Sequence, residues 1–261
     1  MIRELRLFLI ALQFMTRVPV PRWVGFEAER LNRSARHFAG VGMLVGVFGA
    51  GVLWLASRWW PMPVAVGLSM AATLWLTGAF HEDGFADTCD GLGGAVSRER
   101  ALEIMKDSRI GAYGAIGIAM MLGLKAATLA TLPLATALPA LVLGHTASRA
   151  AATALMLLLP YAGDAAHAKA KPLAQQVGAA EGVGAALWLG LVSLGLWGLG
   201  VIAAPGLGIA LVSATLAAMA CARWLRHRLG GFTGDTLGAT QQIAEVALLL
   251  GVSAAGRVGL S

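Results

Sequence analysis

Long apolar segments, separated by short polar ones, run through most of the chain. Seven of these segments have about the 20 residues that an α-helix needs to cross the hydrocarbon core of a bilayer. They are residues 38–57, 61–80, 112–132, 134–159, 183–203, 205–222 and 238–256. Breaks at Pro61, Pro133 and Pro205 separate several of them. We therefore expect an all-α fold, a polytopic integral membrane helical bundle of about seven transmembrane helices, with one domain over residues 1–261.

The N-terminal segment has a different pattern. Arg3, Arg6, Gln13 and Arg17 fall on one helical stripe, and apolar residues cover most of the remaining surface. The apolar stretch 7–12 is too short to span a bilayer, and no small-x-small cleavage site of a signal peptide follows it. We expect an uncleaved helix that lies in or near the cytoplasmic interface of the membrane.

Composition and charge support this class of protein. Hydrophobic residues make up 57% of the chain and charged residues only 13%, against about 25% charged residues in soluble domains. The net charge of +6 does not indicate nucleic-acid binding, because the basic residues lie in the polar segments between the apolar ones. Cys89 and Cys221 are isolated thiols, so we expect neither a disulfide nor a zinc site.

The basic residues also predict the orientation. Seven Arg fall in residues 1–37, four Lys or Arg in 81–111, two Lys in 160–182 and three Arg in 223–237. The alternate connections hold only Arg58. By the positive-inside rule, the N-terminus and the long polar loops face the cytoplasm and the C-terminus lies outside.

One polar segment is unusually acidic. Residues 77–94 read TGAFHEDGFADTCDGLGG and directly follow the second apolar segment. Asp83, Asp87 and Asp90 have the spacing i, i+4, i+7, so a helix brings them to one face, with Glu82 beside them. Like charges packed this way repel unless a cation lies among them, and oxygen ligands without clustered His or Cys favour Mg²⁺ or Mn²⁺. We expect these four carboxylates to be catalytic and to share a metal site; the alternative is a solvated loop whose charges keep it out of lipid.

The next polar segment carries candidate phosphate ligands. Lys106 and Arg109 are placed to contact phosphate oxygens, and Asp107 between them is a further candidate metal ligand. His81, just before the acids, either donates to a phosphate or marks the edge of the bilayer. Both readings stay open from the sequence.

Further polar residues lie in the later apolar segments. Asp235 follows a glycine-rich turn and shares a helical face with Gln242 and Glu245, and we interpret it as a substrate-binding residue. Glu245 is either functional or paired with a buried cation such as Arg149 or Lys125. Arg149 binds an anionic substrate or neutralises a buried carboxylate.

Three motifs resemble one family in family order. They are residues 77–94, residues 98–114 (RERALEIMKDSRIGAYG) and residues 231–238 (GFTGDTLG). Together they resemble the cobalamin synthase family, also called adenosylcobinamide-GDP ribazoletransferases. Cys89 stands where Ala is common in that family and Phe85 where Leu is common, and neither change removes a candidate ligand.

The resemblance implies an enzyme of the bacterial inner membrane that completes the cobalamin nucleotide loop. Its substrates would be adenosylcobinamide-GDP and α-ribazole or α-ribazole 5′-phosphate, GMP would leave, and Mg²⁺ would be the cofactor. On this reading Glu82, Asp83, Asp87 and Asp90 are catalytic, and these four with Asp107 bind the metal. The substrate-binding residues are His81, Lys106, Arg109, Arg149 and Asp235. The sequence leaves open whether the protein forms a homo-oligomer.

Two other functions share part of the pattern. CDP-alcohol phosphotransferases use a similar acidic motif, but Asp87 and Thr88 stand where their Ala and Arg would be. A divalent cation transporter would bind a passing ion with the acids. Such proteins usually carry these groups near the bilayer midplane on broken helices, often with internal repeats, and no repeat is visible here.

Overall fold

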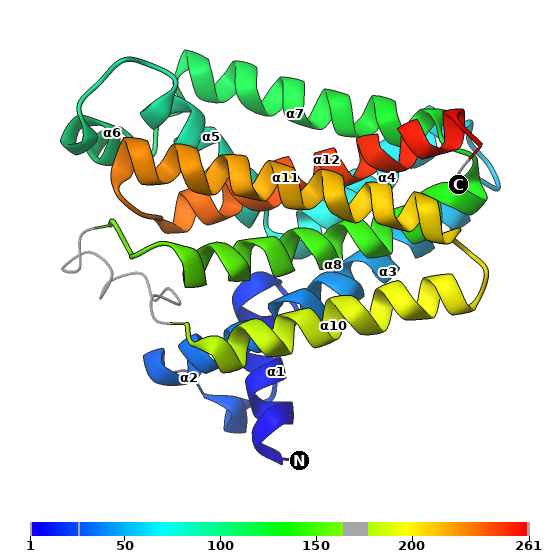
Figure 1. The fold of residues 1–261 in the computed structure, drawn as a ribbon, viewed down its shortest axis with the longest axis horizontal. Helices are drawn as coiled ribbons and strands as arrows, with labels where there is room; N and C mark the ends of the chain where they lie inside the picture. The colour runs from blue at the N-terminus through cyan, green and yellow to red at the C-terminus, as the bar shows by residue number, and fades with distance from the viewer. Residues whose placement is uncertain (1, 26, 164–176, 260–261) are drawn as a thin grey trace.

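A computed structural model describes residues 2–25, 27–163 and 177–259, and these residues form an all-helical molecule (Figure 1). The α-helices are α1 (Ile2–Met15), α2 (Ala28–Ser34), α3 (Phe38–Ala56), α4 (Met62–Thr77), α5 (Phe80–Leu92), α6 (Arg98–Ile104), α7 (Ala112–Thr131), α8 (Leu134–Leu158), α10 (Ala179–Gly198), α11 (Ala204–Leu229) and α12 (Gly234–Arg257). The two lysines predicted to mark the 160–182 loop, Lys169 and Lys171, lie outside the described residues.

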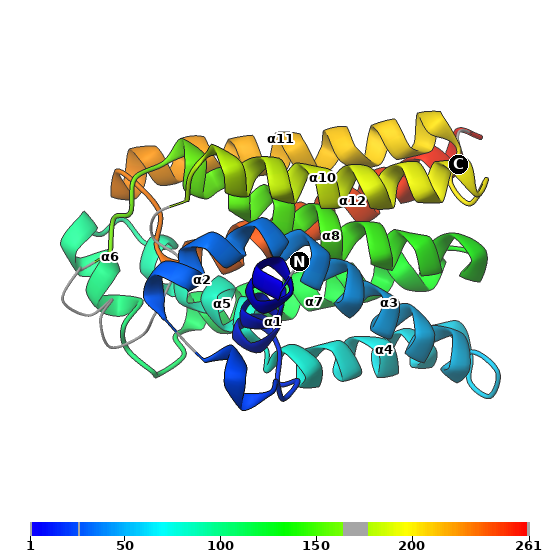
Figure 2. The same cartoon turned by 90° about the horizontal axis from the view of Figure 1, so that it is seen from below.

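The long helices run roughly along one axis of the molecule (Figures 1 and 2). Among the described residues, six helices are long and apolar enough to cross a membrane, and the number rises to seven if the bent pair α4 and α5 counts as one span. This confirms the predicted bundle of about seven transmembrane helices. In α8 and α12, 67% of the most apolar window is buried, against 22% in α7, α10 and α11. Helices α8 and α12 therefore form the centre of the bundle.

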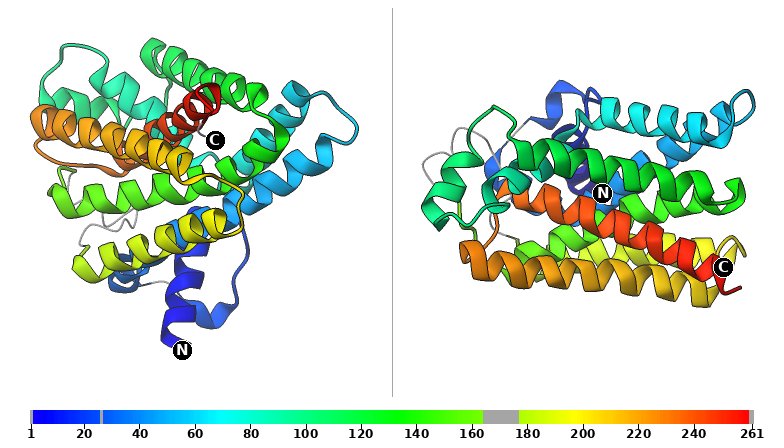
Figure 3. Two further views of the ribbon diagram at one scale, coloured as in Figure 1. Left: turned by 45° about the vertical axis from the view of Figure 1, so that its right-hand side comes forward. Right: turned by 90° about the horizontal axis from the view of Figure 1, so that it is seen from above.

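The second predicted span ends earlier than its apolar pattern suggests. Helix α4 stops at Thr77, Gly78 caps it in the left-handed conformation (φ 69°), and Ala79 is left-handed as well (φ 56°). Two successive left-handed residues end one helix and redirect the chain, so α5 begins at an angle of 90° to α4. The helix ends three residues before the expected bound of the segment 61–80, and the bend that follows was not predicted. Helix α5 lies at the end of the bundle opposite the C-terminus (Figure 3).

Helix α1 crosses the direction of the long helices instead of joining them (Figure 1). Its buried side chains are Leu7, Ile10, Ala11 and Met15. On the other side, Ile2 and Leu5 are exposed. The predicted N-terminal helix is therefore present, and its position in the membrane interface stays a prediction.

Candidate active site

Helix α5 carries the four acids that the sequence singled out. Glu82 and Asp83 lie in its first turn, where the helix dipole favours negative charge. Asp83 is exposed, and Glu82, Asp87 and Asp90 are half-buried. The prediction that these acids lie on a helix is confirmed, so they are presented from a regular element and not from a loop.

Two glycines hold α5 directly against α12. A Cβ atom added to Gly84 would lie 2.9 Å from the Cα of Asp235, and one added to Gly238 would lie 2.9 Å from the carbonyl oxygen of His81. Both distances are too short for any side chain larger than hydrogen. The two backbones therefore touch, which brings the acids of α5 beside the polar face of α12.

Glu82 joins a hydrogen-bond network on that face. The Gln242 amide nitrogen donates to Glu82 Oε1 over 2.7 Å and to Gln241 Oε1 over 2.9 Å. Gln241 in turn donates to Glu245 Oε2 over 2.7 Å and to Ser148 Oγ over 2.8 Å. The second oxygen of Glu82 is buried and has no hydrogen-bond partner among the described residues. One oxygen of Glu82 is therefore fixed by the bundle and the other is left for a ligand.

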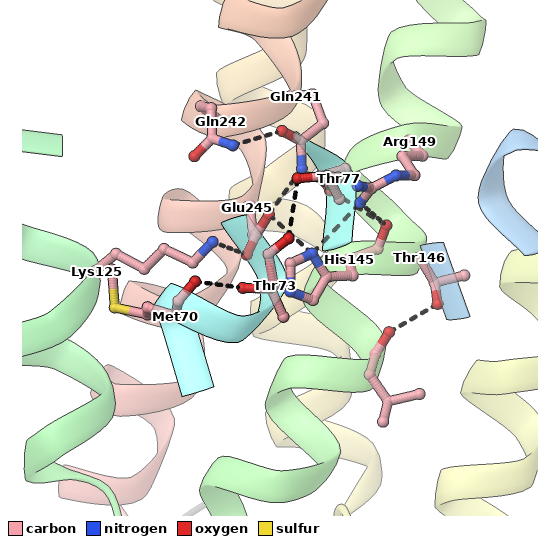
Figure 4. A network of polar contacts seen from close by, with 12 residues as sticks. Met70, Thr73, Thr77, Lys125, His145, Thr146, Arg149, Gln241, Gln242 and Glu245 are labelled. Carbon is pink, nitrogen blue, oxygen red and sulfur yellow. Dashed lines mark hydrogen bonds and ion pairs between the residues drawn. The ribbon is translucent and has the colours of Figure 1, made fainter. Parts of the chain in front are cut away.

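Glu245 lies at the inner end of the network, between α7, α8 and α12 (Figure 4). It is only 1% exposed and forms an ion pair with Lys125, which is 3% exposed. The His145 ring nitrogen Nδ1 lies 3.3 Å from the other oxygen of Glu245. Of the two interpretations of Glu245, pairing with a buried cation is thus the one seen, and the cation is Lys125.

Arg149 is buried in α8, and within the described part of the chain no carboxylate is hydrogen-bonded to it. Its Nη1 donates to the carbonyl oxygen of His145 over 3.1 Å, and it lies 3.3 Å from the His145 ring. Its Nε is buried and has no hydrogen-bond partner among the described residues. A buried guanidinium with an unused N–H favours the interpretation of Arg149 as a binder of an anionic group.

Asp90 has structural partners that the sequence did not predict. Its two oxygens accept from the backbone N–H groups of Gly111, over 2.7 Å, and Gly114, over 2.8 Å. These N–H groups belong to the first turn of α7, so Asp90 caps that helix. Both oxygens are thereby committed. The catalytic and metal-binding roles predicted for Asp90 stay predictions, and these contacts do not favour them.

Asp107 and Arg109 pair with each other at the surface. Arg109 donates through Nη2 to Asp107 Oδ2 over 2.6 Å and through Nε to Oδ1 over 3.0 Å. These hydrogen bonds from Arg109 lower the pKa of the Asp107 carboxyl to about 2. Each group already has the other as its partner, so these contacts do not themselves support a metal-ligand role for Asp107 or a phosphate-binding role for Arg109. Both roles remain predictions.

The expected common metal site of the acids is not assembled. In the described ranges 2–25, 27–163 and 177–259, no three His, Cys, Asp or Glu side chains lie close enough together to hold one ion. Helical geometry explains this: positions i and i+7 are about 10 Å apart along a helix axis, and Asp90 turns toward α7. Asp83 and Asp87, one turn apart, remain as a pair on one face beside Glu82.

The other predicted substrate-binding residues lie around this helix. His81 is buried, Lys106 is exposed just after α6, and Asp235 is half-buried in the first turn of α12. The role of Gln241 and Gln242 in holding Glu82 was not predicted from the sequence. Two adjacent amides in an otherwise apolar segment were the signal for it, because buried amides require hydrogen-bond partners.

The sequence is similar to those of known proteins over most of its length. The sequence model of the cobalamin-5-phosphate synthase family matches residues 7–253. An adenosylcobinamide-GDP ribazoletransferase of Leptothrix cholodnii is 61% identical over 96% of both chains. Proteins with the same description from Shewanella amazonensis and Ralstonia nicotianae are 47% identical over 95% and 48% identical over 92% of both chains. No solved structure matches the chain.

Proposed function

Because this chain belongs to the cobalamin-5-phosphate synthase family, it is an adenosylcobinamide-GDP ribazoletransferase, and we propose that α5 carries its reaction. The enzyme performs the final step of cobalamin synthesis. A ribazole hydroxyl attacks the phosphorus bound to adenosylcobinamide, a new P–O bond forms, and the pyrophosphate P–O bond breaks to release GMP. The proposal rests on the pair Asp83 and Asp87 on one helical face, next to Glu82. One oxygen of Glu82 is held by Gln242, and the other has no partner among the described residues.

We assign Asp83 and Asp87 to Mg²⁺. Mg²⁺ keeps several waters and is usually bound by one or two carboxylates together with substrate phosphates, and not by a cage made of protein alone. Two carboxylates one turn apart suit such a shared site, and their all-oxygen chemistry suits a hard cation. When bound, the ion supplies positive charge that offsets the charge of the pyrophosphate and of the departing GMP.

Glu82 accepts the proton of the attacking hydroxyl in this proposal. Its Oε2 is buried and unpartnered among the described residues, while its Oε1 is held by Gln242 over 2.7 Å. A base must be oriented and must keep one oxygen for the proton, and Glu82 meets both conditions. Asp90 is oriented as well, but each of its oxygens already accepts an N–H group of α7.

Cations around α5 bind the anionic oxygens of the substrates. Lys106 is exposed and would contact the donor pyrophosphate, and Arg149 is buried and keeps Nε for an anionic oxygen. His81 and Asp235 lie where α5 and α12 touch. We further propose that this end of the bundle faces the cytoplasm of the bacterial inner membrane, because Lys and Arg accumulate in its connections.

The test is a transfer assay in lipid nanodiscs. Wild-type protein with adenosylcobinamide-GDP, α-ribazole and Mg²⁺ should release GMP together with a cobalamin product. Asp83→Asn and Asp87→Asn should each lower turnover by about 10²-fold or more, because charge stabilisation at the reacting phosphate is lost. Glu99→Gln, in an exposed acid of α6, is the matched control and should keep wild-type turnover. Turnover within a few fold of wild type in both Asp variants would remove α5 from the reaction.

A further inference from the structure

A pocket opens beside the acids, between α1, α3, α5, α8 and α12. Three phenyl rings, those of Phe14, Phe38 and Phe80, line it together with His81 and Arg149. It adjoins the reaction centre, because His81 directly precedes Glu82 on α5. None of the three phenylalanines has a role in the chemistry described so far, so the pocket requires a separate explanation.

The rings form a continuous aromatic wall. The Phe14 and Phe38 rings stack with their centroids 5.8 Å apart and a 19° angle between planes. Phe80 meets Phe14 edge-on at 5.2 Å. Phe38 is 3% exposed and Phe80 is 39% exposed, so Phe38 lies deep in the wall and Phe80 at its outer edge. Such a wall favours a flat aromatic ligand.

Arg149 adds one positive group to a wall that is otherwise mostly apolar. Arg149 is 1% exposed, and its Nε has no hydrogen-bond partner among the described residues. Gly234, the first residue of the 24-residue helix α12, lines the pocket as well, so a helix N-terminus lies at this wall. A buried guanidinium with a free N–H next to a helix N-terminus is a binding position for an anionic oxygen.

We propose that this pocket binds the acceptor nucleoside as its 5′-phosphate, with the base against the three phenyl rings and the phosphate on Arg149. The inference rests on the proposed function, since it assigns one of the two substrates to the same site. The ribazole base is a methylated benzimidazole without exocyclic polar groups, so against a phenyl wall only its one free ring nitrogen would lack a hydrogen-bond partner. Guanine, the base of the donor, would leave several donors and acceptors without partners there.

The space in the pocket indicates how the base enters. About 420 Å³ is free of protein atoms when counted out to the mouth, but only about 30 Å³ is wide enough for water. The rings therefore rest against one another, and a base enters by replacing the contact between Phe14 and Phe80. Phe80 is the exposed ring and turns without opening the core. The base then stacks where a ring had been, so aromatic contact is retained.

The first experiment compares Phe80→Leu with Phe48→Leu in nanodiscs. Phe48 on α3 is also 39% exposed but does not line the pocket, which makes it a matched control. Phe80→Leu should raise the KM for α-ribazole 5′-phosphate about tenfold, as loss of one base–aromatic stack predicts. The KM for adenosylcobinamide-GDP and kcat should stay at wild-type values, and the control should change none of the three.

The second experiment uses calorimetry to measure binding of α-ribazole and of its 5′-phosphate without the donor. Wild-type protein should bind the phosphate at least tenfold more tightly, Arg149→Met should abolish this preference, and Arg149→Lys should restore part of it. A KM change confined to adenosylcobinamide-GDP in Phe80→Leu would assign the pocket to guanine and overturn the inference. Unchanged KM values for both substrates would overturn it too. Tight nucleoside binding by a wild-type protein that releases no GMP would instead refute the proposed function alone.

Discussion

The buried pair Lys125 and Glu245 gives the most quantitative prediction. Both side chains are almost fully buried, and they join α7 to α12 at the base of the network that holds Glu82. Removing one partner of a buried ion pair leaves an uncompensated charge and costs about 3–5 kcal/mol. Lys125→Met and Glu245→Gln should therefore each lower the free energy of unfolding by about that amount. The double variant leaves no buried charge of this pair and should be no less stable than either single variant.

Thermal unfolding in nanodiscs measures the stability of the two single variants and of the double variant. For a chain of this size, 1 kcal/mol shifts Tm by about 2–4 °C, so each single variant should lose roughly 6 °C or more. Lys106→Met, at an exposed lysine, is the control and should change stability by less than about 0.5 kcal/mol. If the double variant lost the sum of the two single losses, Lys125 and Glu245 would not be coupled and the pairing would be refuted.

Three further predictions concern the site. Gly238→Ala should push α12 away from α5, break the Glu82–Gln242 hydrogen bond and lower kcat at least tenfold, whereas Gly67→Ala, whose added Cβ meets no atom within 4 Å, should leave kcat unchanged. Chelation of divalent cations should stop GMP release and added Mg²⁺ should restore it; undiminished release in excess chelator would contradict the metal assignment. The Asp107 carboxyl should titrate near pH 2 by carbon-13 NMR, and Arg109→Gln should move its midpoint back toward 3.8. Because this pKa is lowered, the pairing with Arg109 is complete above pH 3.8 and is lost as the pH falls through about 2.

The sequence predicted the features that depend on local pattern. The length of the apolar segments predicted the spans, and the spacing of Asp83 and Asp87 predicted one helical face for the acids. Three motifs in order also predicted the family. The sequence model of that family matches residues 7–253, and this match favours the family over the phosphotransferase and transporter alternatives.

The features that were missed depend on contacts between distant segments. Asp90 caps α7 through Gly111 and Gly114, 21 and 24 residues away, and a carboxylate's spacing on its own helix gives no sign of such a partner. The phenyl wall combines Phe14, Phe38 and Phe80 from three helices, and each of them alone resembles an ordinary apolar residue. The 90° bend after α4 was missed because the left-handed Ala79 does not interrupt the apolar pattern.

The 90° turn before α5 affects how the α5 carboxylates respond to the thickness of the surrounding bilayer. A helix that runs along the bundle places successive residues at different depths, 1.5 Å apart. Helix α5 lies at 90° to α4, so its carboxylates are not spread out along the direction of α4. Bilayers that differ in hydrophobic thickness by a few ångströms would then raise or lower all the carboxylates together, without altering the spacing among them.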